Sequence, residues 1–318
     1  NYAKHNTIHD SMSQGVYIIG NGHTVESNEI YNVVRDTYDA GAIYGIVAGE
    51  NIGNKILNNY IHDVTKSYRN WGKVHGIYMD NMSSGTVFSN NIVADCTSGG
   101  LYGGGRDNDI TNNIFLDCKI EYDNRGVFGG WFRINGKYWD LPIVNEEGYE
   151  AERWYSVYPM WKGMVEDYAK EKAWFEDPDN NPKFDAGIPR NAVIEDNVLI
   201  QRDKQLDTLN PVNTWWKASN PDYNTSYMRK LGIDKTKYPN YEEWFKDLKN
   251  RDFTQIEGLQ LFDELPTFNR IDFDAIGNSE YLYGGTASPT LKIPENNRTT
   301  GSKVEFIWEK TSGASEYV

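Results

Sequence analysis

The fold is decided by three matching segments, His75-Gly-Ile-Tyr-Met-Asp80, Gly100-Leu-Tyr-Gly-Gly-Gly-Arg-Asp107 and Ile120-Glu-Tyr-Asp-Asn-Arg-Gly126. Each segment carries aromatic or branched residues of the kind that favour strands, bounded by Gly and Asn residues that favour turns. An Asn-x-Ile tripeptide lies close to each of them in the chain. The spacing predicts three short strands stacked one on another.

The three segments align on their apolar positions. One column holds Ile77, Leu101 and Ile120, and the next holds Tyr78, Tyr102 and Glu121. Because side chains alternate along a strand, an inward apolar column directs Tyr78, Asp80 and Asp123 outward. Gly104 falls between the two carboxylates, which leaves a slot wide enough for a sugar. The simpler alternative is a pair of surface Asp residues at strand ends, with a Gly at a bend.

A tripeptide of the form Asn-x-Ile recurs along the first part of the chain. The copies begin at Asn6, Asn28, Asn59, Asn90 and Asn112. Their Ile residues lie 22, 31, 31 and 22 positions apart, and about 22 residues of strand character fit one turn of a parallel β-solenoid. Asn side chains stacked at equivalent corners hydrogen-bond one another and tolerate left-handed backbone, so we expect a structural role for them. The pattern predicts an all-β fold, a parallel β-helix.

Two turns of this solenoid carry nine extra residues each, at about 35–41 and 65–74. Both insertions leave an Asn-x-Ile strand and return before a Gly-x-Tyr strand, so we expect them beside the Tyr and Asp face. The second insertion contains Lys66, Tyr68, Arg69 and Trp71. These side chains suit the wall of a carbohydrate cleft, and a cover for apolar surface is the alternative.

The period stops after Gly126, where a long insertion rich in Trp, Tyr and Pro occupies residues 127–190. Residues 164–175 are predicted to be helical, and residues 191–200 restore the strand pattern. Because the insertion leaves the solenoid beside the carboxylates, we expect it to fold over the cleft. Trp131, Trp139 or Trp161 would then stack on a substrate ring, and packing of the insertion onto the solenoid is the alternative.

The solenoid domain is predicted to span residues 1–285. Within it, residues 241–249 are expected to form a short helix, and residues 268–277 are expected to cap the open parallel edge. Residues 286–318 resemble the opening strands of a β-sandwich module. Since residue 1 begins inside a repeat, we expect the sequence to be part of a longer protein that lacks N-terminal turns here.

Composition limits the partners of the protein. The chain has 318 residues and a net charge of −14, which disfavours nucleic acid, anionic membranes and polyanionic polysaccharides. The sequence contains no apolar run long enough to predict a membrane span, and it shows no signal peptide. The aromatic content of 14% suits stacking on sugars as well as a β-rich core. Cys96 and Cys118 occupy equivalent places in successive repeats, which favours stacked thiols, with a disulfide as the alternative.

Asp80 and Asp123 are the candidate catalytic pair. Hydrolysis of a glycosidic bond needs one carboxylic acid to protonate the leaving oxygen and a second carboxylate to attack or to activate water. Two layers of a parallel stack separate the backbones by ~9.6 Å, which favours a water between the carboxyls, although inclined side chains reach a shorter distance. Glu121 is the next candidate, and clustered like charges are expected to raise the pKa of the acid.

The other candidates for substrate binding surround this pair. They are His75, Tyr78, Arg106, Glu121, Arg125, Trp71 and Trp131. Arg106 and Arg125 suit sugar hydroxyls or carboxylates, with structural salt bridges to Asp107 or Asp123 as the alternative. His75 suits a substrate hydroxyl or a turn. We predict no metal site and no cofactor, since zinc and calcium ligand patterns are absent from the sequence.

In the three opening segments, in Asn112-Asn-Ile-Phe-Leu-Asp-Cys118 and in residues 271–277, the chain resembles right-handed parallel β-helix glycoside hydrolases of family 141. The resemblance covers about residues 1–280. It implies a secreted or periplasmic bacterial enzyme, a xylanase or α-L-fucosidase acting on plant cell-wall polysaccharide, with Asp80 and Asp123 as its catalytic acids. The chain departs from that family in lacking the N-terminal half of the β-helix and in having Asn81 where a second acidic residue often follows the first.

Two other functions fit the same fold. A polysaccharide lyase or uronate epimerase would recruit Arg106, Arg125 and Tyr78, although the negative charge of the chain disfavours a uronate polymer. A non-catalytic carbohydrate-binding solenoid would use the same aromatic loops without turnover. The sequence predicts an oligosaccharide or polysaccharide partner in each case and leaves the oligomeric state open.

Overall fold

The protein, seen here in a computed structural model, consists of two units, residues 1–277 and residues 278–318. The structure describes residues 1–45, 51–65, 73–80, 83–123, 149–184, 191–200, 202, 228–232, 238–256, 261, 263, 265–277, 291–293 and 307–308. The domain boundary expected after residue 285 lies outside the described residues and stays a prediction. In the second unit, β20 (Leu291–Ile293) pairs antiparallel with β21 (Ile307–Trp308); the β-sandwich assignment stays a prediction.

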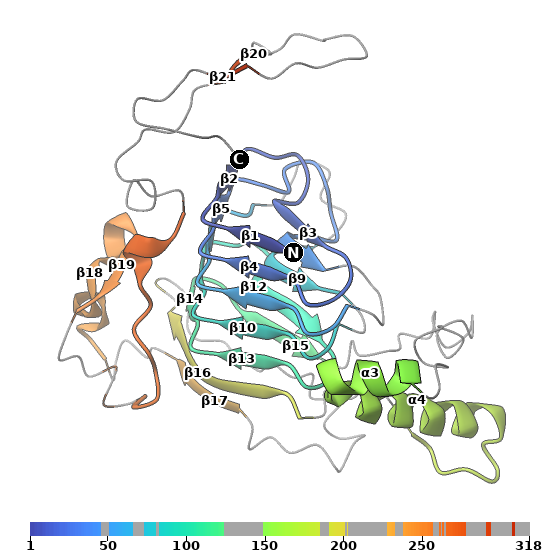
Figure 1. Ribbon diagram of the computed structural model, residues 1–318. Helices are drawn as coiled ribbons and strands as arrows, with labels where there is room; N and C mark the ends of the chain where they lie inside the picture. Colours follow the sequence, from blue (N-terminus) through green and yellow to red (C-terminus); the bar gives the residue numbers. More distant parts are fainter. Residues whose placement is uncertain are drawn as a thin grey trace. The chain divides into compact units, whose positions relative to one another are not determined.

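Three stacks of short parallel strands build the first unit (Figure 1). The first stack contains β1 (Tyr2–Lys4), β4 (Thr24–Glu26), β7 (Lys55–Leu57), β10 (Val87–Ser89) and β13 (Asp109–Thr111). The second stack contains β2 (Thr7–His9), β5 (Glu29–Tyr31), β8 (Tyr60–His62), β11 (Ile92–Ala94) and β14 (Ile114–Leu116). The third stack contains β3 (Val16–Ile18), β6 (Ala40–Gly45), β9 (Val74–Met79), β12 (Gly99–Gly104) and β15 (Ile120–Asp123). Each turn of chain contributes one strand to each stack, which confirms the predicted parallel β-helix.

One long strand joins the first two stacks. The first half of β16 (Val193–Ile200) pairs with β13 and its second half pairs with β14. β17 (Met228–Gly232) pairs in parallel with β16. The third stack forms a separate sheet in the order β15-β12-β9-β6-β3. Apolar side chains from all three stacks fill the interior between the sheets, so the core runs the length of the solenoid.

The register of the third stack agrees with the alignment of the sequence segments. Leu101 lies opposite Ile77 and Ile120, and Tyr102 lies opposite Tyr78 and Glu121. Gly104 lies opposite Asp123. The predicted columns are therefore confirmed, with β12 between the strands that lead to the two candidate carboxylates.

The Asn ladder differs from its prediction by one residue in two turns. Its members are Asn6, Asn28, Asn59, Asn91, Asn113 and Asn197. The Nδ2 amide of each side chain up to Asn113 donates to Oδ1 of the next Asn along the axis. Asn90 and Asn112 are instead the preceding corner residues, with φ of +59°. The two roles that the sequence assigned to one Asn, the ladder and the left-handed corner, thus belong to neighbouring residues.

The two predicted insertions lie where expected, between the second and third stacks. One leaves β5 and returns at β6, and the other leaves β8 and returns at β9. Both therefore reach the solenoid again at the start of the third stack. Lys66, Tyr68, Arg69 and Trp71 of the second insertion lie outside the described residues, so their role in a cleft wall stays a prediction.

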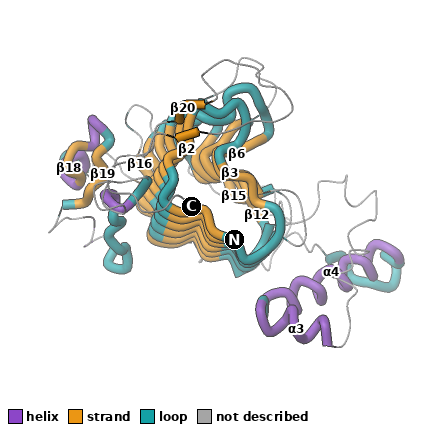
Figure 2. Tube along the Cα trace, turned by 45° about the horizontal axis from the view of Figure 1, so that its top comes forward, coloured by secondary structure: helices purple, strands orange, loops and turns teal. Residues whose placement is uncertain are grey.

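Two helices of the long insertion pack on the corner that follows the third stack. They are α3 (Tyr149–Val157) and α4 (Met160–Glu176), and α4 includes the predicted helix 164–175. The Tyr158 hydroxyl donates to Asn21 over 2.9 Å, and Ile52 packs in one apolar cluster with Trp161. Figure 2, a view turned toward the solenoid axis, shows these helices beside that corner. Trp161 is 1% exposed, which supports its packing role rather than stacking on a substrate.

The segment from 238 to 277 covers the outer face of the second stack. Its apolar side chains, among them Trp244, Phe253 and Phe268, pack on Ile92 and Ile114. Gly277 N donates to Ser27 O over 2.8 Å. The segment thus lies along the flank of the solenoid, and the prediction that residues 268–277 cap its end is wrong. It is visible beside the second stack in Figure 2, opposite the helices.

The helix predicted at 241–249 is also wrong. Those residues form a 3-10 turn (Tyr241–Trp244), then β18 (Phe245–Asp247), then a second 3-10 turn (Leu248–Asn250). β18 pairs antiparallel with β19 (Asp252–Gln255), and a last 3-10 turn spans Phe273–Ala275. Asp247 accepts from Asn250 N and starts the second turn. Pairing with β19 therefore replaces the helical hydrogen bonds.

Two arginines bind a column of corner aspartates, and one of them, Arg251, belongs to the segment 238–277 and holds it on the flank of the solenoid. Arg251 donates to Asp63 over 2.5 and 2.9 Å and to Asp95 over 2.8 Å. Arg202 donates to Asp95 and Asp117. All three aspartates have positive φ at equivalent corners. The hydrogen bond from Arg251 lowers the pKa of Asp63 to about 2, against the opposing effect of burial.

Substitution of Arg251 by Leu is expected to weaken the acid dependence of stability. A carboxylate with a lowered pKa adds stability in full above its ordinary pKa of about 4, and that contribution is lost as the pH falls toward 2. The Arg251→Leu protein should be less stable at neutral pH and should lose less on acidification across that window. Thermal unfolding at pH 7, 4 and 2.5 measures both effects. Lys249→Leu removes an exposed charge two residues away and serves as the control. An equal change in thermal stability in both variants would contradict a specific role of the Arg251–Asp63 ion pair.

The two cysteines are free and buried in successive turns, as predicted. Cys96 N donates to Cys118 Sγ over 3.1 Å. Burial raises the pKa of the Cys118 thiol, so it stays protonated in the interior and contributes as an apolar group.

Candidate functional site

Aromatic rings line the outer face of the third stack. Tyr17, Tyr44, Tyr78 and Tyr102 occupy one register column on β3, β6, β9 and β12, and Glu121 continues it on β15. Successive ring centroids are 5.5, 5.2 and 4.9 Å apart. The column follows from the Gly-x-Tyr repeat, because a fixed register places the same residue type on the same face of every layer.

Asp80 directly follows β9 and belongs to this face. The Tyr44 hydroxyl donates to Asp80 Oδ2 over 2.9 Å, and the Tyr78 hydroxyl lies 3.3 Å from Asp80 Oδ1. The backbone N of Asp80 donates to Gly45 O over 2.9 Å and extends the ladder. The residue points away from the core, as predicted, but it is only 7% exposed. Asp80 is therefore an outward carboxylate that is held among phenols.

Asp39 is a second carboxylate on this face that the sequence patterns missed. It closes the first insertion just before β6, is exposed and has a φ of +54°. The Tyr78 hydroxyl lies 3.2 Å from Asp39 Oδ1. The repeat offered no signal for this residue, since the insertion interrupts the period that aligned the other columns.

Tyr44 is a hydrogen-bond donor in this site. Burial raises the pKa of Tyr44, and the neighbouring Asp80 raises it further. Its phenol therefore keeps its proton at neutral pH and presents it to the carboxylate.

The ring of His75 packs against two tyrosines of this column. Its side chain is fully buried, stacks on Tyr102 at 4.6 Å and meets Tyr78 edge-on at 5.6 Å. Gly41 and Gly99 lie opposite it on the neighbouring strands, which leaves room for the imidazole. The geometry supports a packing role for His75, and contact with a substrate hydroxyl stays a prediction.

Glu121 forms ion pairs with two lysines. Lys73 Nζ and Lys119 Nζ each lie 2.8 Å from its carboxylate. Burial acts to raise the pKa of Glu121, but the hydrogen bonds from Lys119 and Lys73 outweigh it, and the net pKa is lowered. Glu121 is therefore a poor proton donor, contrary to the raised pKa expected for a carboxyl in this cluster.

Arg106 anchors the long insertion. Its guanidinium donates to Asp107 and to Asp167 of α4, each over 2.6 Å, and the residue is 9% exposed. The salt-bridge alternative thus describes Arg106, whose planar donors bind these two carboxylates. Arg125, Trp71, Trp131 and Trp139 lie outside the described residues, as does the side chain of Asp123; their roles stay predictions.

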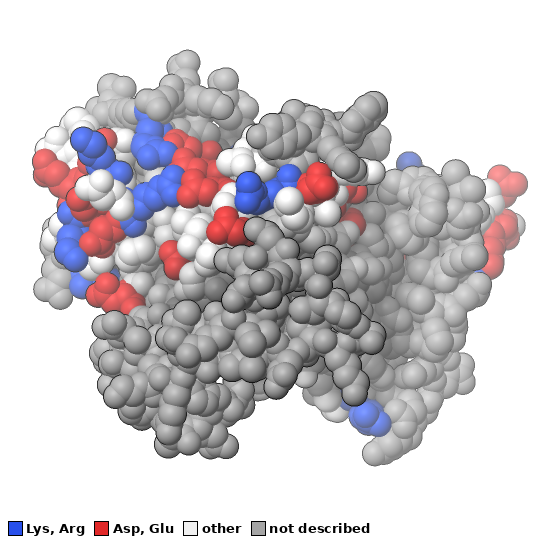
Figure 3. Space-filling view, turned by 90° about the horizontal axis from the view of Figure 1, so that it is seen from above, with Lys and Arg blue, Asp and Glu red and all other residues white. Residues whose placement is uncertain are grey.

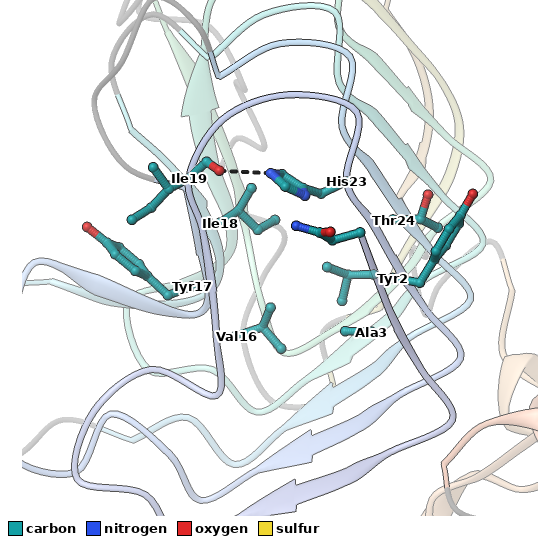
Figure 4. Close-up of a pocket in the computed structure, with 10 residues that line it drawn as sticks. Tyr2, Ala3, Val16, Tyr17, Ile18, Ile19, His23 and Thr24 are labelled. Atoms are coloured by element: carbon teal, nitrogen blue, oxygen red, sulfur yellow. Dashed lines mark hydrogen bonds between the residues drawn. The ribbon is translucent and has the colours of Figure 1, made fainter. Parts of the chain in front are cut away.

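A cavity of about 260 Å³ opens elsewhere, at the end of the solenoid formed by β1, β3 and β4. Figure 4 shows apolar side chains around it, including Val16 and Ile18, and His23 donating toward Ile19 O. Its lining contains no acidic residue. This space continues the solenoid interior and brings together no group for acid–base chemistry.

Charged residues of both signs share one face of the described part of the protein. Figure 3 shows acidic and basic residues interspersed over the coloured part of the face seen from above. No cluster of three or more His, Cys, Asp or Glu residues suited to a metal ion occurs among the described residues. Within the same residues, no helix has the length and apolarity to cross a membrane.

Comparison with known proteins supports the fold. A family model described as "right handed beta helix region" matches residues 1–135. This match agrees with a right-handed solenoid. A cell surface glycoprotein of Methanothermus fervidus is 30% identical over 141 residues, which cover 42% of this chain and 23% of that protein. The chain thus spans less than a quarter of the length of this curated relative. No solved structure matches significantly.

Proposed function

We propose that the protein is a glycoside hydrolase whose site is the outer face of the third stack, with Asp80 as one of its carboxylates. The observation that carries the proposal is the setting of Asp80, which is 7% exposed, accepts a hydrogen bond from Tyr44 and lies beside the hydroxyl of Tyr78. Asp80 is fixed by phenols, and the ring of Tyr17, stacked on Tyr44, is 48% exposed; the site thus combines an acid–base group with a surface that stacks on sugars.

The partner carboxylate predicted from the sequence is Asp123. Its backbone lies opposite Gly104 at the end of β15, one layer beyond the strand that neighbours β9. The absence of a side chain at Gly104 leaves space above the sheet between the two positions. Hydrolysis needs an acid and a base or nucleophile on opposite sides of the bond, and this spacing suits an intervening sugar ring.

The substrate class proposed is a plant cell-wall polysaccharide, xylan or a fucosylated pectic side chain. A net charge of −14 favours sugars without carboxylates. The relative with a cell-surface name favours an extracellular or periplasmic location, where such polymers are found.

Release of reducing ends from xylan and from fucosylated pectic fragments tests this function. We expect wild-type protein to release them and Asp80→Asn protein to lose the activity while it keeps its thermal stability. Unchanged rates in both Asp123→Asn and Asp80→Asn proteins would rule out the proposed pair. Lys162→Gln, at an exposed position of α4, is the control and should retain the wild-type rate.

A non-catalytic carbohydrate-binding solenoid is the second candidate, favoured by the name of the cell-surface relative. It predicts saturable glycan binding without products. A lyase or epimerase is disfavoured because Arg106, one of the residues that it would recruit, is 9% exposed and bound to Asp107 and Asp167. An unsaturated product, detected by ultraviolet absorbance after incubation with pectin or alginate, would reverse that order.

A further inference from the structure

Three acidic groups on the outer face of the third stack differ in what holds them. Glu121 is paired with two lysines. Asp80 is held by Tyr44 and lies beside Tyr78, whereas Asp39 is exposed and lies beside the same Tyr78 hydroxyl. Within the described residues, Asp39 and Asp80 are thus joined through a single phenol.

The distances limit the separation of the two carboxyls. The Tyr78 hydroxyl is 3.2 Å from Asp39 Oδ1 and 3.3 Å from Asp80 Oδ1. These two oxygens can therefore be no further apart than the two distances laid end to end. That limit accommodates the ~5 to 5.5 Å separation of retaining glycosidases and the shortest separations of inverting ones, ~6.5 Å.

The Tyr78 hydroxyl has one proton for two acceptors. It can donate to Asp39 or to Asp80 at one time, so both carboxyls are positioned around the same phenol, and Tyr44 holds Asp80 in addition.

We propose that Asp39 is the catalytic partner of Asp80 in a carboxyl pair joined through Tyr78. The inference rests on the proposed hydrolase function and puts Asp39 in the place that the sequence assigned to Asp123. One carboxyl gives its proton to the leaving glycosidic oxygen as the C–O bond breaks. The other takes a proton from a water whose oxygen bonds to the anomeric carbon. One water is consumed, and the pair as a whole keeps its proton count.

Exposed aromatic rings near Asp39 give this pair a place for a sugar. Tyr38 precedes Asp39 in the chain and is 58% exposed, and Tyr17, stacked on Tyr44, is 48% exposed. Aromatic faces of this kind bind the apolar faces of sugar rings. The substrate would therefore lie over the start of β6, with Asp39 on its open side and Asp80 on its buried side.

Kinetics of full-chain variants test this pair. The probes are xylan, 4-nitrophenyl β-D-xyloside, fucosylated pectic fragments and 4-nitrophenyl α-L-fucoside. Asp39→Asn keeps the shape of the side chain, and Asn tolerates the positive φ of this position. We expect kcat to fall about 10²- to 10⁴-fold, with a much smaller change in KM. Asp36→Asn, at an exposed position in the same insertion, should keep the wild-type rate.

A second variant covers a failure of Asp39→Asn to fold. Glycine also adopts the backbone of this position, and Asp39→Gly leaves space for a small carboxylate, so added formate should restore part of the lost rate. A wild-type rate in Asp39→Asn, or a low rate in Asp39→Gly that formate does not raise, would overturn the inference and leave the hydrolase proposal standing. Wild-type protein that cleaves none of the four probes would overturn both.

Discussion

Asp80→Asn protein is expected to turn over its substrate about 10²- to 10⁴-fold more slowly than the wild type, which is the usual contribution of a positioned acid or base. Asn has nearly the same shape and can still accept from Tyr44, whose hydroxyl lies 2.9 Å from Asp80. The fold should therefore persist, and the loss should appear in kcat. Steady-state kinetics on the substrate found by reducing-sugar release, together with thermal unfolding, measure the two effects.

Two comparisons sharpen this prediction. Tyr44→Phe removes one donor to Asp80 and leaves the carboxylate, so a loss of about tenfold is expected, the scale of one hydrogen bond to a charged group. Glu26→Gln changes a partly exposed carboxylate on the first stack, paired with Lys4, and should leave the rate unchanged. A wild-type rate in Asp80→Asn protein would remove Asp80 from the reaction.

Asn91→Ala is expected to lower the free energy of unfolding by about 3 kcal/mol. The Asn91 side chain is buried, accepts from the backbone and side chain of Asn59, and donates to Ile56 O and Asn113 Oδ1, all at 2.8 to 3.0 Å. Its removal leaves several buried polar groups without that partner, and each such group costs about 1–3 kcal/mol before relaxation. Denaturant unfolding measures the change.

The neighbouring residue is the matched control for the ladder. Asn90 has a φ of +59° and accepts from Asn112 at 2.5 Å. Asn90→Gly keeps the left-handed corner accessible, so a loss below about 1 kcal/mol is expected. A larger loss for Asn90→Gly than for Asn91→Ala would contradict the register and would restore the ladder first predicted from the sequence.

The register of β9, β12 and β15 was predictable because their sequence segments align on one apolar column. Gly-x-Tyr segments fix which residue faces outward, and a one-residue slip would bury the tyrosines and expose the core. The second stack was less predictable, since both Asn90-Asn91 and Asn112-Asn113 are double Asn pairs. Ile92 and Ile114 face outward and are covered by the flank segment. A local sequence pattern cannot show that residues more than a hundred positions away in the chain will cover this outer face of the second stack.

The flank segment shows the same limit. Tyr241, Trp244, Phe245 and Leu248 have the spacing of an amphipathic helix, and all four are buried. That spacing also fits two short turns with a strand between them, once β19 supplies an antiparallel partner. Asp39 was missed for a related reason, because it lies in an insertion and meets Tyr78 only through tertiary structure.

The most direct test is a crystal structure of Asp80→Asn protein soaked with an oligosaccharide that the wild type cleaves, or with xylo-oligosaccharides if binding is found without cleavage. The account predicts a sugar ring over the outer face of the third stack, within hydrogen-bond distance of residue 80 and in contact with the tyrosine column. A sugar bound only elsewhere on the protein, including the cavity between β1, β3 and β4, would contradict it.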